Sequence, residues 1–441
     1  MPPRTSSDTS KKRQKAAIES SSSSSSEDDD FDLIEEVLDD SESEDEIEFK
    51  PRRASSSSNK KQNSTQKKNT NSSSLSSSSN KKKQTTNNRK KKKKNSSDEE
   101  SSSNSDSEEK NKKKSKKTDK KKTQPTEKDK EKMNKLWERF VTGKPRLLIG
   151  CHVAFGSLGI EHAPLAAAEN GCCGAFALFL GNQKTYAQKD YTDKQVSKFI
   201  ENCKALNYDR DYLLPHASYL INLANPDKEK LAKSKTLFLT EYKKCERLGL
   251  KRYNFHPGST VGETTVENGC KQIAECINWA NSQVDNVISV LECVAGSGNT
   301  IGHKFEQLKM IIDHVEDKNR VGICLDTCHM FAAGYDLRTQ EGCKKVFDEF
   351  DQIIGFKYLK GMHLNDSKEN LNSKKDRHED IGQGHLGLEV FKYIVNNPKF
   401  RNIPLILETP GGNYIKEIAE LYDLYTGEED EVKPSSSEIS N

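Results

Sequence analysis

Residues 1–128 of this 441-residue chain contain almost no aromatic side chains and neither cysteine nor histidine. They consist mainly of Ser, Lys, Asn and acidic residues, in long homopolymeric stretches. Such a segment cannot bury enough apolar surface to offset the conformational entropy of folding, so we predict that residues 1–128 are a disordered tail. We expect the same of residues 426–441. The intervening residues 129–425 are enough for one large α/β domain with a well-buried core.

Further absences limit the class of protein. No apolar stretch approaches the length of about 18 residues that a membrane-spanning helix needs, so no membrane partner is expected. The eleven cysteines form no CxxC pairs and no secretory signal opens the chain. Reduced thiols in the cytosol or nucleus are therefore expected rather than a disulfide framework. A phosphate loop of the form GxxxxGK[ST] is also missing, and the glycine-rich segment 296–302 lacks GxGxxG spacing.

Charge is divided unevenly along the chain. The net charge of +3 is the sum of +7 on residues 1–128 and −4 on the remainder. Within the tail, residues 27–48 are acidic, whereas residues 81–94 and 112–122 are rich in lysine. These basic runs are typical of nuclear import and of sequence-independent attraction to phosphate, although solvated chain would also explain them. We expect a nuclear location; a mitochondrial share stays an open alternative, although the acidic stretch is unlike a transit peptide.

Eight short apolar runs recur through residues 147–409, and each ends on a polar or metal-competent side chain. The residues that end them are His152, Asn182, His216, His256, Glu292, Asp326, His363 and Glu408. Helical patterns separate the runs, and this alternation implies parallel strands joined by right-handed crossovers. Functional groups at the strand ends are typical of a (β/α)8 TIM barrel, which we predict. A doubly wound open sheet would alternate in the same way, but would not place such residues at nearly every strand end.

Two helices can be delimited from local patterns. Residues 127–141 predict a leading helix that ends near Gly143. The apolar residues Phe238, Tyr242, Cys245 and Leu248 follow helical spacing, and Gly249 is a stop signal.

The polar residues at the run ends indicate metal chemistry. A single histidine at a strand end is more often a hydrogen-bonded core residue than a ligand, but seven His, Asp and Glu residues in register reverse that expectation. Two loops add further candidates, because DTCH at 326–329 supplies His329 and KDRH at 375–378 supplies Asp376 and His378. Histidine and carboxylate ligands without cysteine are suited to catalytic Zn²⁺, with Mn²⁺ as second choice.

Several blocks of the chain resemble one known family. They are GCHV at 150–153, LPHASYLINL at 214–223, NFHPGS at 254–259, LECVAGSG at 291–298, LDTCHMFAAGYD at 325–336, KGMHLNDSK at 360–368, DRHEDIGQG at 376–384 and PLILETP at 404–410. They closely resemble the endonuclease IV family of apurinic/apyrimidinic DNA repair enzymes. The resemblance covers about residues 146–425, essentially the whole of the expected domain.

The resemblance implies three zinc ions per chain. The first would be held by His216, His256 and Glu292; the second would share Glu292 as a bridge and add Asp326, His363 and Glu408; the third would be held by His329, Asp376 and His378. All nine positions carry the family's residue. The family does not use the position of His152 as a ligand, so we expect this side chain to lie in the core or behind a ligand.

The resemblance also implies an activity. The family hydrolyses the phosphodiester 5′ to an abasic site in duplex DNA, leaves a 3′-hydroxyl and trims blocked 3′ ends, as a step of base excision repair. Glu292, as the bridging ligand, is the implied catalytic residue. The implied DNA-binding residues are Asn182, Lys184, Tyr219 and Leu220, and the family's habit is a monomer. The family inserts loop side chains into the DNA where the base is missing, at the positions that match Lys184, Tyr219 and Leu220. Lys184 departs from the arginine that the family commonly has there, and an ammonium cannot stack as a guanidinium does.

Two other functions remain open. A metal-dependent sugar isomerase or epimerase would also present His, Asp and Glu at the strand ends of this barrel, typically for one or two metals. A chromatin-binding module could use the basic tail while the barrel stays inert. The complete set of nine candidate ligands disfavours both.

Overall fold

The computed structural model describes residues 126–427, and everything below concerns this part of the chain. The expected disordered segments 1–128 and 426–441 lie almost wholly outside the described residues, as do the acidic and basic runs. The domain limits therefore stay a prediction. Within residues 126–427 no helix combines the length and the apolar character needed to cross a membrane.

The described elements alternate between strand and helix for most of their length. The strands are β1 (Leu148–Cys151), β2 (Arg252–Phe255), β3 (Ile288–Glu292), β4 (Val321–Asp326), β5 (Leu359–His363), β6 (Asp366–Ser367), β7 (His378–Glu379) and β8 (Pro404–Leu407). The α-helices are α2 (Glu127–Trp137), α3 (Ala163–Glu169), α4 (Asp193–Ala205), α5 (Lys228–Leu248), α6 (Val266–Asn281), α7 (Phe305–His314), α8 (Thr327–Ala333), α9 (Gln340–Ile353), α10 (Glu389–Asn396) and α11 (Tyr414–Asp423). Short 3₁₀ turns lie at Gly156–Leu158, Ile160–His162, Arg210–Tyr212, Lys318–Arg320, Phe356–Tyr358 and Pro398–Phe400.

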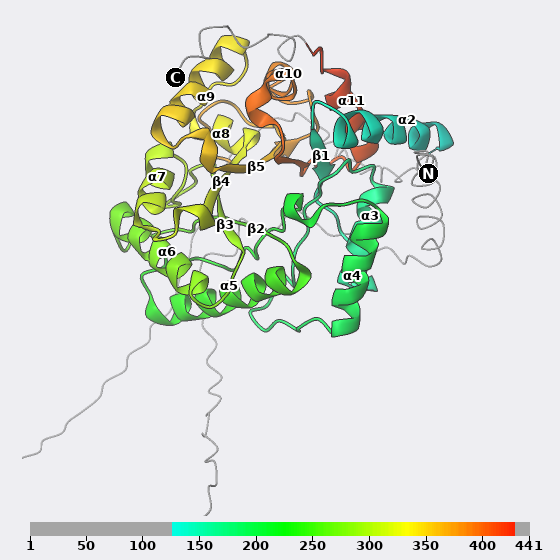
Figure 1. Cartoon of the computed structure of the whole chain (residues 1–441). Helices are drawn as coiled ribbons and strands as arrows, with labels where there is room; N and C mark the ends of the chain where they lie inside the picture. Colours follow the sequence, from blue (N-terminus) through cyan, green and yellow to red (C-terminus); the bar gives the residue numbers. More distant parts are fainter. Residues whose placement is uncertain (1–125, 428–441) are drawn as a thin grey trace, which may run out of the picture. The chain divides into compact units, whose positions relative to one another are not determined.

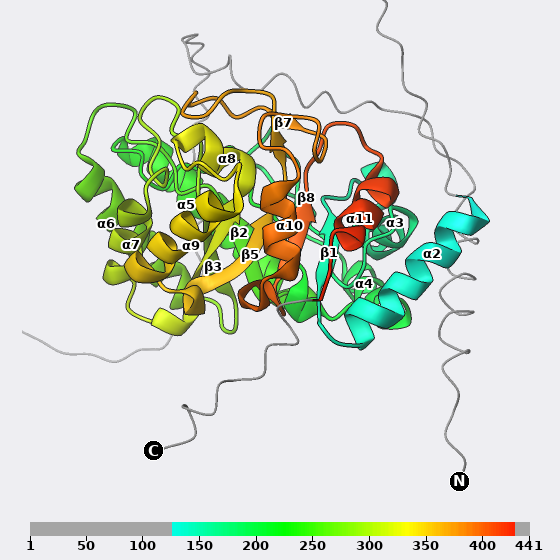
Figure 2. The same cartoon turned by 90° about the horizontal axis from the view of Figure 1, so that it is seen from above.

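Six strands form a parallel sheet in the order β1-β8-β5-β4-β3-β2. Helices α5, α6, α7 and α9 lie outside these strands (Figure 1). The short antiparallel pair β6–β7 is separate from this sheet, and β7 lies at the same end of the barrel as α8 (Figure 2). Together with two further extended runs, the six strands make the expected TIM barrel.

The second and third of the eight expected strands are irregular. Their pairing is reduced to single bridges: His152 with Ala177, Phe179 with His216, and His216 with Asn254. Backbone hydrogen bonds still close the barrel there, because Leu214 N donates to Phe176 O and His216 N to Leu178 O. Pro215 lies within the third run and has no N–H to donate to a ladder, which helps to explain why no regular strand forms.

Both sequence-predicted helices are present. Residues Glu138–Thr142 continue α2 as a π-helical turn, and the helical segment ends before Gly143. The end of α5 at Leu248 is followed by Gly249 with φ +70°, a left-handed cap that glycine adopts without steric cost. At the other end of α5, the Asp227 side chain accepts hydrogen bonds from the backbone N–H groups of Glu229 and Lys230.

The barrel interior beneath the strand ends is filled by a small apolar cluster. Its buried members come from most of the barrel strands: Leu148, Ala175, Ala177, Leu214, Val290, Cys324 and Ile406. A larger apolar core lies between the strands and the helices. The interior is therefore packed rather than open, and polar chemistry is confined to the end of the barrel.

Strand β1 passes so close to the second apolar run, at Ala175, that a side chain at Gly150 should strongly destabilise the fold. A Cβ at Gly150 would lie 1.9 Å from Ala175 O, a backbone atom that cannot move aside without opening the barrel. We expect Gly150→Ala to lower the free energy of unfolding by about 3 kcal/mol or more, measured by urea denaturation. The control is Gly156→Ala, where a Cβ meets nothing within 4 Å but φ is +52°, with an expected loss of about 1–2 kcal/mol. Equal losses would contradict this account.

Candidate metal centre

The candidate ligands gather where the barrel strands end. Glu292 and His363 are the last residues of β3 and β5, and Asp326 ends β4. The register of β4 on β5 places Asp326 directly opposite His363. Neighbouring parallel strands end at the same edge, so side chains far apart in the sequence converge there.

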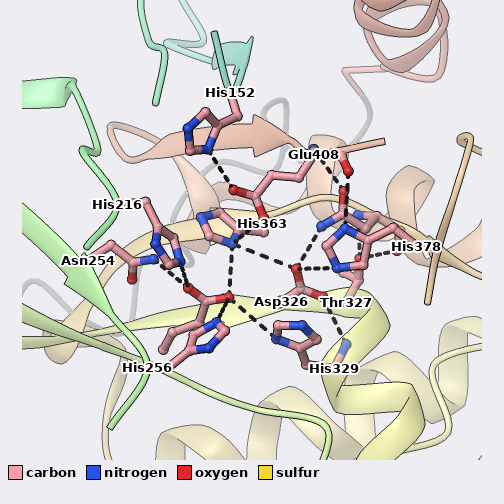
Figure 3. Close-up of polar contacts among 12 residues, drawn as sticks. His152, His216, Asn254, His256, Asp326, Thr327, His329, His363, His378 and Glu408 are labelled. Atoms are coloured by element: carbon pink, nitrogen blue, oxygen red, sulfur yellow. Dashed lines mark hydrogen bonds and ion pairs between the residues drawn. The ribbon is translucent and has the colours of Figure 1, made fainter. Parts of the chain in front are cut away.

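Glu292 is the centre of this arrangement. Its side chain is fully buried, and its two oxygens face four imidazoles. Oε2 lies 3.2 Å from His216 Nε2, whereas Oε1 lies 3.1 Å from His363 Nδ1, 3.4 Å from His329 Nδ1 and 3.5 Å from His256 Nε2. The four histidines are labelled in Figure 3. One carboxylate thus touches members of all three ligand sets implied by the resemblance.

His363 joins Glu292 to the other two carboxylates of the second implied set. Its Nδ1 atom lies 3.3 Å from Glu408 Oε2 and 3.7 Å from Asp326 Oδ2. The structure therefore brings Glu292, Asp326, His363 and Glu408 together, as expected from the sequence.

The third implied set also assembles, although its members come from loops and short elements. Asp376 lies 2.8 Å from His329 Nε2 and 3.1 Å from His378 Nε2. His329 is on α8 and His378 is on β7. The donor atoms of His329, Asp376 and His378 lie within 4.8 Å of one another, and so do those of His216, His256 and Glu292.

Three side chains behind the candidate ligands hold the carboxylates in place. Asn254 Nδ2 donates a hydrogen bond to Glu292 Oε2. Asn365 Nδ2 donates to Asp326 Oδ2 at 2.7 Å, and its Oδ1 accepts from Glu408 N at 2.9 Å. His152 Nδ1 lies 3.0 Å from Glu408 Oε1, which agrees with the expectation that His152 lies behind a ligand. The sequence did not point to the two asparagines, because an asparagine near a strand end carries no signal of what it will face.

The electrostatics of the centre are dominated by these imidazole–carboxylate pairs. Burial by itself would raise the pKa of Glu292, but the positive charges of His363 and His256 hold that pKa well below its usual value. Burial would likewise lower the pKa of His378, yet the Asp376 carboxylate raises it to about 9. Without another cation, protons on the histidines balance the buried carboxylates.

The donor chemistry fits divalent cations. Four carboxylates and five imidazoles converge on a mostly buried region, and carboxylates buried together need positive charge close by. Imidazole nitrogen and carboxylate oxygen are both ligands of Zn²⁺. Cations could take the place of the protons without any change in the set of side chains. The individual ligand roles stay predictions.

The expected DNA-binding residues form a rim beside this centre. Tyr219 is 37% exposed, and its ring centroid lies 5.3 Å from that of His216 and 5.7 Å from that of His256. Leu220 is half-buried beside it. Asn182 and Lys184 lie on the neighbouring loop, where the Asn182 side chain accepts a hydrogen bond from Lys184 N at 2.7 Å. Thus none of the four belongs to the set of candidate ligands, and their role in DNA binding stays a prediction.

Comparison with known proteins places the chain in a family. The family model described as xylose isomerase-like TIM barrel matches residues 164–426. "Apurinic-apyrimidinic endonuclease 1" of Plasmodium falciparum is 50% identical over 282 residues, which are 63% of this chain and 47% of that protein. "Probable endonuclease 4" of Chlorobium phaeobacteroides is 51% identical over 262 residues, 59% of this chain and 92% of that protein. The crystal structure of endonuclease IV from Thermus thermophilus is 25% identical with a TM-score of 0.56, covering 63% of this chain and 98% of that one.

These matches define a TIM barrel of the xylose isomerase-like class. Within that class, the chain belongs to the endonuclease IV family of apurinic/apyrimidinic endonucleases. The match spans about half the length of the proteins named "Apurinic-apyrimidinic endonuclease 1": 47% of that of Plasmodium falciparum and 56% of that of Plasmodium berghei.

A further buried carboxylate holds the loops around the centre. Glu417 of α11 accepts hydrogen bonds from Ile381 N at 3.0 Å and from the Thr409 hydroxyl at 2.7 Å. It thereby joins the segment after β7 to the residue that follows Glu408. Burial, with a smaller effect from Asp380, raises the pKa of Glu417 from 4.5 to about 7.

This raised pKa predicts a pH-dependent contribution to stability. The folded protein binds the Glu417 proton more tightly than the unfolded chain, so this group's contribution falls as pH rises from 4.5 to about 7. Glu417→Gln keeps an acceptor for Ile381 N and cannot ionise. We expect the variant to gain up to about 3 kcal/mol relative to wild type between about pH 4.5 and about pH 8, measured by urea unfolding. A difference that does not change with pH would refute the assignment.

Proposed function

We propose that this protein is a zinc-dependent apurinic/apyrimidinic endonuclease of base excision repair. It hydrolyses the phosphodiester 5′ to an abasic sugar in duplex DNA and leaves a 3′-hydroxyl, and it also trims blocked 3′ ends. We further propose that it acts as a monomer in the nucleus, a location supported by the lysine-rich runs at 81–94 and 112–122. Relatives named as apurinic-apyrimidinic endonuclease and endonuclease 4 support the general activity.

The strongest support for this proposal is the position of Glu292. Glu292 lies in contact distance of four histidines that belong to three separate ligand groups. A single carboxylate shared in this way suits a multinuclear site, which phosphodiester hydrolysis requires more than sugar isomerisation does. Zinc ions bound there would neutralise the phosphate charge, supply a strong nucleophile from water at neutral pH and stabilise the leaving oxygen.

The chain's own residues would hold and orient this chemistry. Glu292 would be shared between the sites at His216/His256 and at Asp326/His363/Glu408. Asn254 fixes the rotation of the Glu292 carboxylate, and Asn365 does the same for Asp326. Such partners behind the ligands orient them and tune their basicity.

The rim residues account for recognition of the lesion. An abasic sugar must leave the helix to reach a site at the bottom of a barrel mouth. Tyr219 and Leu220 are largely apolar side chains at that mouth and are suited to fill the space left by a missing base. Lys184 would contact the phosphate backbone rather than stack, since its ammonium is a point charge.

A metal-dependent sugar isomerase or epimerase is the second candidate, because the matching family model is described as xylose isomerase-like. It would need no apolar rim and no third ligand group. An incision assay on duplex DNA separates the two.

We expect zinc-loaded wild type to cut a duplex oligonucleotide once, immediately 5′ to a stable abasic analogue. Glu292→Gln should lower the rate by at least about 100-fold. Mutation of a residue that only hydrogen-bonds to a metal ligand already lowers metal affinity or activity by about 10–100-fold. Metal content, measured by mass spectrometry, should fall in this variant. The matched control is Glu263→Gln, an exposed residue after β2 that loses the same charge and should keep wild-type turnover. If zinc-loaded wild type makes no cut, the proposal fails and sugar substrates take its place.

The lysine-rich tail predicts a salt effect on DNA affinity. Removing residues 1–125, which leaves the N-cap Thr126 of α2 in place, should flatten the dependence of KM on salt while kcat at saturating DNA stays unchanged. The reason is that fewer counterions are released when the truncated protein binds. The slope of log KM against log salt concentration is the measurement. A loss of turnover at saturating DNA would show that the tail does more than attract phosphate.

A further inference from the structure

Helix α5 carries two charged side chains that the metal centre does not use. Glu241 and Lys244 are 0% and 2% exposed and lie one turn apart on the helix face that meets the barrel. Charged residues are almost never fully buried unless they are paired or hydrogen-bonded, because removing them from water is costly. Their contacts therefore indicate what they are retained for.

Glu241 holds the loop that carries Tyr219 and Leu220. Its Oε2 atom accepts hydrogen bonds from Ser218 N at 3.1 Å and from the Tyr253 hydroxyl at 2.6 Å. Its Oε1 atom is buried and has no hydrogen-bond partner among residues 126–427. Ser218 is the residue immediately before Tyr219, so the carboxylate fixes the start of the rim loop.

Lys244 holds the loop that carries Lys184. Its Nζ atom donates to Leu180 O at 2.8 Å and lies 4.8 Å from the centroid of the Tyr191 ring. The Tyr191 hydroxyl donates to the same carbonyl oxygen. Leu180 is the last buried residue before the segment 181–188, so Lys244 fixes the point at which this segment leaves the barrel.

The two loops are also joined to each other at the surface. Tyr219 N donates to Gln183 Oε1 at 3.3 Å, and the Tyr186 hydroxyl donates to Leu220 O at 2.8 Å. The two loops are therefore held together as one unit, by Glu241 and Lys244 of α5 from below and by these two hydrogen bonds at the surface. This unit contains Lys184, Tyr219 and Leu220.

We propose that Glu241 and Lys244 are positioning residues for DNA binding, which hold the two rim loops from beneath in the conformation that receives the lesion. The inference rests on the proposed function. Loops that are already ordered lose less conformational entropy when a ligand binds, so preorganisation raises affinity without any new contact. The hydrogen bonds of the two side chains go to the loops and to Tyr253 rather than to an expected ligand of the metals, so the chemical step itself is left unchanged.

The test uses the full chain, loaded with zinc, and a duplex that contains one abasic analogue. Glu241→Met and Lys244→Met remove the charge but keep the approximate volume, and each should raise KM about tenfold while kcat stays within about twofold. Glu241→Gln keeps an acceptor for Ser218 N and should recover most of the affinity. The matched control is Tyr242→Phe on the same helix, which removes a buried hydroxyl that bonds Asn281 and Val287 O, away from both loops; its KM should equal that of wild type.

A second readout follows the rim directly. A 2-aminopurine base placed next to the abasic position, in a duplex whose scissile linkage is blocked, reports the insertion of side chains by a change in fluorescence. The protein concentration at half-maximal signal should shift in parallel with KM for both Met variants and not for Tyr242→Phe.

Two outcomes overturn the inference. The first is that both Met variants have the same KM as Tyr242→Phe and lose a similar amount of melting temperature. Glu241 and Lys244 would then be ordinary core residues. A fall in kcat or in zinc content would mean that Glu241 acts on His216, two residues before Ser218. If Glu241→Met does not fold, Lys244→Met decides alone. Failure of wild type to cut the duplex would instead remove the proposed function, which is a separate result.

Discussion

The rest of the site depends on the contacts between the buried carboxylate of Glu292, at the end of β3, and the four histidines around it. A carboxylate without water needs positive charge and hydrogen-bond donors around it. The protein meets this need with imidazoles from four different segments of the chain and with the amide of Asn254. Those segments can meet at one point only because parallel strands of a closed barrel end at the same edge.

Buried carboxylates recur throughout this end of the molecule, and their partners divide them into two kinds. Those that face the centre, such as Glu292, are surrounded by imidazoles and suit cations. Those behind the loops accept hydrogen bonds from the backbone instead. Asp366 accepts four of them, from the N–H groups of Ser367, Gly384, Leu386 and Gly387. The first kind would perform the chemistry, and the second gives fixed positions to loops that have little apolar packing of their own.

This division also shows how a fold shared by a whole class of enzymes could present the proposed site for DNA. The barrel and its apolar interior are general, whereas function is decided by side chains grafted on the loops. Here the loop bearing Lys184 and the loop bearing Tyr219 are hydrogen-bonded to each other and to α5. A rim held in this way would need little further ordering to bind the proposed DNA duplex.

The sequence by itself determined the class of fold and the candidate ligands. Eight apolar runs with polar ends predicted the barrel, because hydrophobic periodicity and strand-end chemistry are local properties of the chain. The same pattern led to the expectation that Glu292 and His363 would meet, and the distance of 3.1 Å between Glu292 Oε1 and His363 Nδ1 bears this out. The leading helix and the stop at Gly249 were equally local, since caps and stop signals act within one turn.

Only the tertiary structure decided which side chains support the site. Three of these contacts depend on packing between segments distant in sequence. They join Asn254 to Glu292, Asn365 to Asp326 and Glu408, and Glu241 to Ser218. The irregular second and third strands were hidden for the same reason, because strand pairing depends on the neighbouring strand as well as on the residue. Composition can indicate that a polar group will be buried, but the partner that satisfies it is decided when the barrel closes.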